Sequence, residues 1–104
     1  MAYHSAADVG GHRIELHVLM RTVFIKVDGQ YEAISEPDKK VRTRIALKAL
    51  GMWKEFLRQA PEGVYYCTPE RDELRELYVK AGWTTRPGRG RLVYEHKGFD
   101  EGAN

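Results

Sequence analysis

The sequence predicts an α/β (α+β) domain, built around a mixed central sheet with helices on its faces. Three observations lead to this fold class: an alternating N-terminal run, a long apolar stripe at helical spacing, and a C-terminal half in which strands and helices alternate. The predicted order is βββ-α-β-α-ββ. A chain of 104 residues with 42% hydrophobic residues suffices for one domain with a modest core.

The first three predicted strands form an antiparallel meander. In 13–20, apolar residues at even positions alternate with mostly polar ones, which is typical of a strand with one face on a core. The β-rich run 23–27 is the second strand. Asp28 and Gly29 predict a type I′ hairpin turn, because both central residues of that turn need positive φ. The segment 31–35 then returns as the third strand.

A long helix is predicted from about residue 38 to residue 60. Its apolar side chains recur at helical spacing and form a broad stripe, and Pro61 and Gly63 end it. The run 64–67 that follows is short and almost entirely apolar. Such a run is typical of a central strand covered on both faces.

The second predicted helix opens at Thr68 and stops at Gly82. Thr68 supplies an N-cap hydroxyl and Pro69 suits the first helical position. Gly82 suits the left-handed position that follows the last turn. The last two predicted strands are 83–86 and 91–95.

Outside these elements the sequence is less informative. Residues 1–12 are expected to be a flexible leader or a short edge strand, 13–97 the single domain, and 98–104 a frayed tail. The N-terminus lacks the features of a signal peptide, and no apolar run approaches the roughly 20 residues of a membrane span. A single cysteine, Cys67, fits a reducing compartment, so a cytoplasmic location is expected.

Reactive and metal-binding residues give little signal. Cys67 lacks His and Asp partners at a catalytic spacing, so it is interpreted as a small buried hydrophobe. The four histidines lack metal-ligand spacing, and no metal site is expected. They are His4, His12, His17 and His96.

Positive charge is concentrated although the formal net charge is only +2. Five basic residues and no acid lie between Lys39 and Lys48, and three arginines lie between Arg86 and Arg91. Lys40, Arg44 and Lys48 share one helix face at i, i+4 and i+8. Two interpretations stay open: a localised anion site, or a solvated face paired with nearby acids.

The element order, together with Leu77-Tyr78-Val79-Lys80-Ala81-Gly82-Trp83, resembles the GNAT (N-acetyltransferase) superfamily over roughly residues 13–96. In that family Tyr-x-x-x-Gly-Phe ends the second helix, and its tyrosine often protonates the departing CoA thiolate. The resemblance implies acetyl-CoA as cofactor and an amine that attacks the thioester directly, with Tyr78 as general acid. The alternative is a core tyrosine whose hydroxyl reaches the surface.

The resemblance also places the cofactor's phosphates. The family's pyrophosphate loop, Arg/Gln-x-x-Gly-x-Gly/Ala, falls on Val41-Arg42-Thr43-Arg44-Ile45-Ala46, where only Ala46 keeps the pattern. Arg44 replaces a glycine that lets backbone N–H groups approach the phosphates, and Arg71 replaces an expected asparagine. The family's N-terminal elements are absent or reduced, as in small, diverged acetyltransferase-like proteins of bacteriophages.

The sequence therefore leaves two main functional interpretations. The first is an acetyltransferase that binds a CoA thioester and an amine acceptor. The second is a catalytically degenerate GNAT-fold protein, a phage accessory or virion component, that binds a host protein through its basic face. Nucleic-acid binding through the basic clusters is a third option. Candidate general bases, by strand location alone, are Glu15, His17, Glu32 and Glu36.

Overall fold

A computed structural model of the chain describes residues 2–31, 36–69, 72–85 and 91–98. It confirms the α+β class with a mixed sheet and two helices. The helices are α1 (Lys39–Leu57) and α2 (Asp72–Lys80). The strands are β1 (Ala2–Val9), β2 (His12–Leu19), β3 (Thr22–Val27), β4 (Gln30–Tyr31), β5 (Gly63–Cys67), β6 (Thr84–Thr85) and β7 (Leu92–His96).

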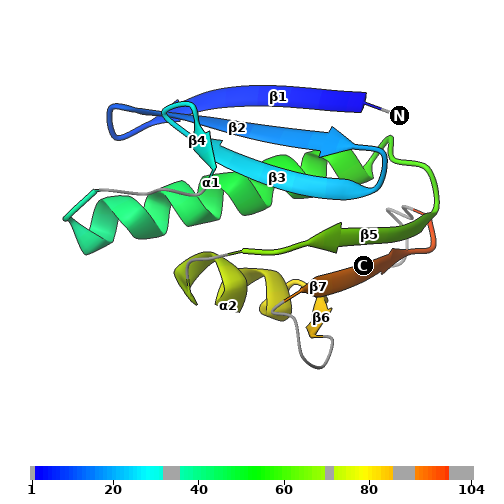
Figure 1. The fold of residues 1–104 in the computed structure, drawn as a ribbon. Helices are drawn as coiled ribbons and strands as arrows, with labels where there is room; N and C mark the ends of the chain where they lie inside the picture. The colour runs from blue at the N-terminus through cyan, green and yellow to red at the C-terminus, as the bar shows by residue number, and fades with distance from the viewer. Residues whose placement is uncertain (1, 32–35, 70–71, 86–90, 99–104) are drawn as a thin grey trace.

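The sheet has the strand order β1-β2-β3-β5-β7-β6, with β4 paired to β3 beside this path. All neighbouring strands are antiparallel except β3 and β5, which are parallel and meet at two residue pairs, Thr22–Tyr66 and Val23–Cys67. Both helices pack on the same face of the sheet, behind it in Figure 1. The other face, called the open face below, is not covered by any described helix.

The N-terminal meander includes a full edge strand in residues 1–12, for which the sequence predicted a flexible leader or a short edge strand. Strands β2 and β3 confirm the predicted strands 13–20 and 23–27, and the turn between β3 and β4 has positive φ at both Asp28 and Gly29. Residues 2–9 form an edge strand that pairs along its whole length with β2. The predicted strand 31–35 begins within β4, and residues 32–35 lie outside the described part of the chain.

The remaining elements follow the sequence closely. The predicted helix 38–60 is α1, and Asp38 caps it by accepting a hydrogen bond from the Lys40 backbone N–H. Strand β5 matches the predicted run 64–67, and β6 and β7 match the final pair within two residues. Helix α2 begins at Asp72 among the described residues. No helix in the described ranges has the length and apolar character needed to cross a membrane.

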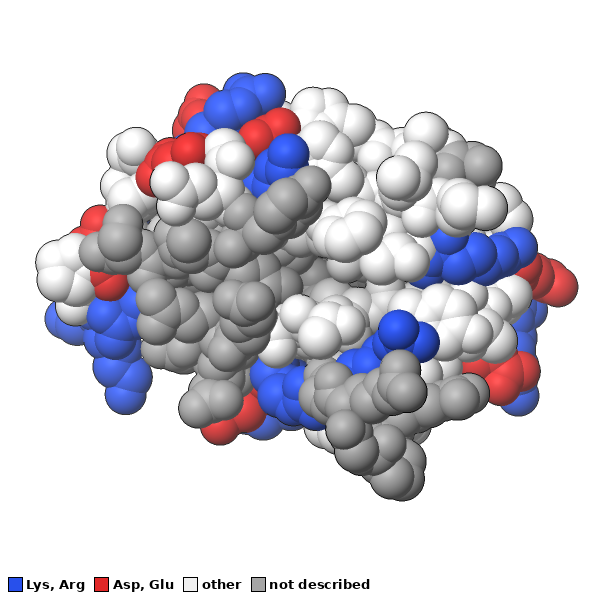
Figure 2. Space-filling model, viewed as in Figure 1, with Lys and Arg blue, Asp and Glu red and all other residues white. Residues whose placement is uncertain are grey.

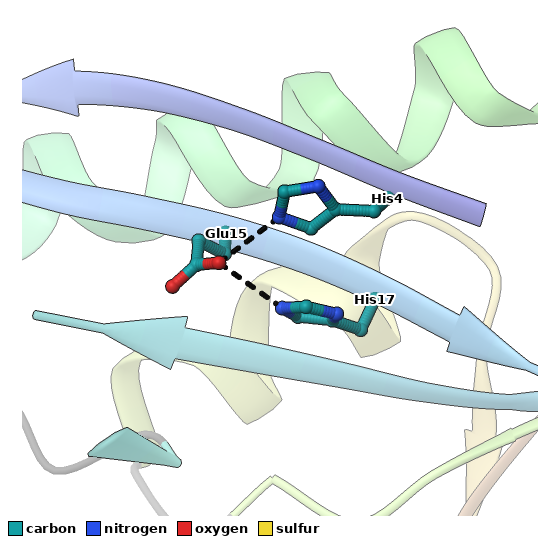
Figure 3. A group of neighbouring side chains, drawn as sticks. All are labelled: His4, Glu15 and His17. Carbon is teal, nitrogen blue, oxygen red and sulfur yellow. Dashed lines mark hydrogen bonds and ion pairs between the residues drawn. The ribbon is translucent and has the colours of Figure 1, made fainter. Parts of the chain in front are cut away.

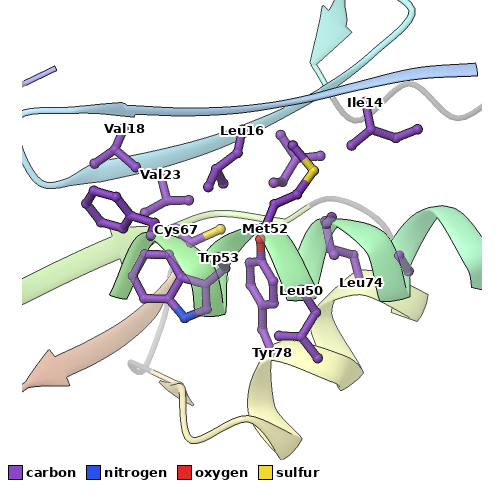
Figure 4. Packing of buried hydrophobic residues seen from close by; sticks show 14 of the residues in the cluster. Ile14, Leu16, Val18, Val23, Leu50, Met52, Trp53, Cys67, Leu74 and Tyr78 are labelled. Atoms are coloured by element: carbon purple, nitrogen blue, oxygen red, sulfur yellow. The ribbon is translucent and has the colours of Figure 1, made fainter. Parts of the chain in front are cut away.

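One continuous core lies between the sheet and the two helices (Figure 4). Alternate residues of β2 and β3 point into it, and α1 contributes its apolar stripe. Trp53 is central, with ring centroids 4.9 Å from Trp83, 5.6 Å from Tyr65 and 5.7 Å from Phe56. Cys67 is fully buried in the same cluster, as its interpretation as a small hydrophobe requires.

Helix α2 ends in a Schellman motif. The Trp83 N–H donates to the Tyr78 carbonyl at 3.0 Å, and the Gly82 N–H donates to the Val79 carbonyl at 3.1 Å. Gly82 has a φ of +105°, and the Tyr78 and Trp83 rings stack at 5.4 Å with an interplanar angle of 15°. A 6→1 bond, a 5→2 bond and an apolar contact between the flanking residues define this cap. The spacing Tyr-x-x-x-Gly-aromatic is therefore the spacing that the helix cap needs.

Candidate functional site

Tyr78, the predicted general acid, lies in the core. Its side chain is 0% exposed, its ring stacks on Trp83, and its hydroxyl points away from α2 toward the sheet (Figure 4). A cofactor thiolate would therefore have to enter the protein to come within the ~3 Å that proton transfer needs.

The predicted phosphate cradle lies in the first two turns of α1. Asp38 occupies the helix cap, Arg42 donates to the carbonyls of Glu36 and Pro37 at 2.9 and 2.8 Å, and Thr43 donates to the Lys39 carbonyl. The side chains of Asp38, Arg42 and Thr43 therefore already make hydrogen bonds to the backbone of the protein. The cradle residues Ile45 and Ala46 are buried, Val41 is partly buried, Arg44 is exposed, and Arg71 lies outside the described residues.

The exposed basic residues on α1 include Lys39 and Lys54, and three more that share one helix face at i, i+4 and i+8, namely Lys40, Arg44 and Lys48. The last three form the basic face, a name used below for these three residues. The second basic cluster is described only at Arg91, whose guanidinium carbon lies 5.4 Å from the Tyr66 ring centroid. This cation–π contact gives Arg91 a structural role between β7 and β5.

On the edge of β3 that faces β5, a two-residue interval, Phe24 and Ile25, lies between the residues paired with β5 and those paired with β4. Strand β5 pairs with Thr22 and Val23, and β4 pairs with Lys26 and Val27. Residues 32–35, which continue the chain from β4, lie outside the described part of the chain. Phe24 points to the open face and is partly exposed, while Ile25 is buried toward the helices. This interval is where two parallel strands diverge.

The open face carries a cluster that sequence spacing does not reveal: His4, Glu15 and His17 (Figure 3). The Nε2 of His4 lies 2.9 Å from Glu15 Oε1, and the Nε2 of His17 lies 3.2 Å from the same oxygen. The two imidazole rings lie 4.4 Å apart. The hydrogen bond from His4, followed by that from His17, lowers the pKa of the Glu15 carboxyl from its ordinary value.

Strand register creates this cluster. Glu15 and His17 are two residues apart on β2 and so share a face, and His4 of β1 lies directly opposite His17. The two-residue turn Gly10–Gly11, with φ of +57° and +83°, fixes that register. Two glycines between alternating strands are a hairpin signal in their own right. That signal could have placed the two histidines together from the sequence.

A shallow depression of about 370 Å³ adjoins the cluster. His4 and His17 form part of its wall, and the other lining residues are Ala2, Tyr3, Val18, Leu19 and Phe24. In Figure 2, which views the open face, a stretch without Lys, Arg, Asp or Glu extends toward the N-terminal start of β1, and charged residues gather at the opposite end of the meander. The depression is therefore mostly apolar, with two imidazoles at its edge.

A second titratable group centres on His12 at the other end of β2. Its Nδ1 bonds Asp28 and its Nε2 bonds Glu36 at 2.7 Å, so one ring joins the β3–β4 turn to the segment that leads into α1. These hydrogen bonds, Asp28 first, raise the pKa of His12 above its ordinary value of 6.5. They lower the pKa values of Asp28 and Glu36. Glu36, a candidate base, thus has a structural partner.

The four candidate general bases therefore do not share one site. Glu15 and His17 belong to one cluster, Glu36 belongs to the His12 group, and Glu32 lies outside the described residues. No protein-family model, curated protein or solved structure matches the chain.

Proposed function

We propose that the chain is a compact GNAT-type protein that binds a CoA thioester where β3 and β5 diverge and transfers its acetyl group to an amine. The observation that carries the proposal is the sheet topology. After the meander, α1 leads to β5 parallel to β3, and β7 is inserted between β5 and β6. The order of these elements along the chain is the one on which the resemblance, together with Tyr78 to Trp83, rests.

The interval at Phe24 and Ile25 supports the location of the thioester. The buried Ile25 alternates with Val23 and Val27 on the helix side, and Cys67 of β5 is paired with Val23 at one end of the interval. A pantetheine arm that entered there would lie beside Cys67, where the pairing of β5 with β3 ends. It would also approach the core that contains the Tyr78 hydroxyl.

The phosphates of the cofactor are assigned to the basic face. Arg44 is exposed, and its guanidinium lies against the Gly10 turn beside the start of α1. A bidentate guanidinium suits phosphate. Because Asp38 already caps α1, the phosphate contact in this proposal is made by side chains rather than by the helix N-terminus.

Isothermal titration calorimetry with acetyl-CoA tests the proposal, using Arg44→Glu and the matched control Lys54→Glu. Lys54 is an exposed cation in the last turn of the same helix. Reversal at Arg44 is expected to weaken binding about tenfold, because losing an exposed cation contact and adding repulsion amounts to about 1 kcal/mol or more. Lys54→Glu leaves it unchanged. No heat at millimolar acetyl-CoA contradicts the proposal, as does an equal effect of both variants.

A second function, partner binding without catalysis, is favoured by a specific observation. The Schellman cap accounts for the Tyr78–Trp83 spacing without chemistry, and Tyr78 is fully buried. In this case the basic face would bind an acidic protein surface. Combined reversal of Lys40, Arg44 and Lys48 should then abolish capture of that partner. Arg42 is left unchanged because its guanidinium donates hydrogen bonds to the carbonyls of Glu36 and Pro37, which hold the start of α1. Capture that survives the triple reversal rules out this version.

A further inference from the structure

We propose that His4, Glu15 and His17 form a binding site for a divalent transition-metal ion of the Zn²⁺ class on the open face of the sheet. This site lies on the face of the sheet opposite α1. His17 pairs with Phe24 of the interval, but none of the three ligands is assigned to acetyl-CoA, so metal binding and acetyl-CoA binding are tested separately. The inference comes from the convergence of three ligand atoms from two paired strands.

Distances favour a shared ion. The three ligand atoms lie within 4.8 Å of one another, and the two nitrogens lie 2.9 and 3.2 Å from Glu15 Oε1. In a tetrahedral Zn²⁺ site with bonds of about 2.0–2.1 Å, neighbouring ligand atoms are about 3.3 Å apart. Small rotations of the side chains would therefore bring all three atoms into coordination without backbone movement.

The ligand chemistry agrees with the distances. Two imidazoles and one carboxylate are the protein ligands of many catalytic zinc centres, and they leave coordination positions for water. Without the ion, an Nε2–H of each ring donates to the carboxylate. With the ion, each neutral ring carries its proton on Nδ1 and binds the metal through the Nε2 lone pair, and a ring that was doubly protonated releases one proton to solvent. The charge of the ion then replaces the hydrogen bonds that hold the cluster together.

The scaffold and the exposure suit an open site. Strands β1 and β2 pair at eight consecutive positions, which fixes the Cα positions of all three ligands before an ion arrives. The side chains of Glu15, His17 and His4 are 16%, 31% and 47% exposed, so an ion reaches them directly from solvent. The remaining coordination positions would face the depression beside His4 and His17. A water molecule or a small ligand bound there would be accessible.

The test uses tag-free protein titrated with ZnCl₂ in a non-chelating buffer, and a parallel titration with Co²⁺ followed by visible absorption. Wild type is expected to bind a single Zn²⁺ ion per chain and to give the intense absorption of low-coordinate Co²⁺. Glu15→Gln keeps the shape of the side chain and removes its charge. Since outer-sphere changes alone cost 10–100-fold in metal affinity, loss of this ligand should weaken Zn²⁺ binding about 100-fold or more.

Three further variants complete the design. His17→Gln should also weaken Zn²⁺ binding strongly, and the His12→Gln control, which changes a histidine outside the cluster, should not. Circular dichroism without metal shows whether each variant is folded. If His17→Gln does not fold, the test uses Glu15→Gln. His4→Ala retains two ligands and should bind more weakly than wild type. Absence of Zn²⁺ binding by wild type overturns the proposal. An unchanged Zn²⁺ affinity in folded Glu15→Gln also overturns it. The same holds if Zn²⁺ binding is lost only in His12→Gln.

Discussion

Gly10 and Gly11 provide the sharpest stability prediction, because an added methyl group would meet another part of the protein at only one of these two turn glycines. A methyl group at Gly10 would lie 2.9 Å from Val41 Cγ1, and the same group at Gly11 meets nothing within 4 Å. Both residues have positive φ, so an alanine at either costs roughly 1–2 kcal/mol of backbone strain. Val41 is β-branched and on a helix, so it cannot rotate away easily.

Overpacking of this kind adds about 1–3 kcal/mol. Gly10→Ala should therefore lower the free energy of unfolding by about 2–5 kcal/mol and Gly11→Ala by about 1–2 kcal/mol. Urea unfolding followed by tryptophan fluorescence measures both values. The double variant Gly10→Ala/Val41→Ala should recover part of the difference. Equal losses in the two single variants would refute the packing of the β1–β2 turn against α1.

Three other variants test separate parts of the structure. His12 has a raised pKa, so its bonds to Asp28 and Glu36 stabilise the fold fully from pH 6.5 down to the range in which these two carboxylates protonate. This stability is lost as pH rises through the folded pKa of His12. In pH-dependent urea unfolding, His12→Gln should remove the decline at the higher pH. Tyr78→Phe keeps the stack on Trp83, so a near-wild-type unfolding free energy with lost acetyl transfer would support an acid role, whereas retained transfer would exclude it. Leu16→Ala, at a fully buried position, should cost about 2–5 kcal/mol by urea unfolding, and a cost below ~1 kcal/mol would contradict its core position.

Local signals in the sequence placed most of the elements. Asp28 and Gly29 need positive φ, and the structure has it at both residues. Gly82 was expected to stop α2, and its cap hydrogen bonds confirm this. These features depend on neighbours within a few residues, where turn and cap chemistry is decisive.

Strand β1 was harder to predict because its residues are poor strand formers. Alanine, serine and aspartate dominate residues 5–8, and these residue types are depleted in strands. Its pairing with β2 compensates, since eight residue pairs join the two strands. The same pairing creates the contact between His4 and His17, which lie 13 positions apart in the sequence. Spacing along the chain could not show it without the register.

The interpretation of Tyr78 depended on the motif alone, because burial is a property of tertiary packing. The sequence placed it on the apolar side of a helix, and the structure adds the stack on Trp83 and complete burial. The motif thus predicted a helix cap correctly, and its catalytic meaning stays a prediction. Whether a cofactor reaches this tyrosine depends on the interval between β3 and β5.

Amide hydrogen exchange with and without acetyl-CoA tests that interval most directly. The account predicts that saturating acetyl-CoA slows exchange in β3 around Phe24 and Ile25 and at Tyr66 and Cys67 of β5, where the pairing with β3 ends, with little change in β1. Unchanged exchange in β3 and β5 at saturating cofactor, or protection confined to the basic face, would contradict binding between the diverging strands.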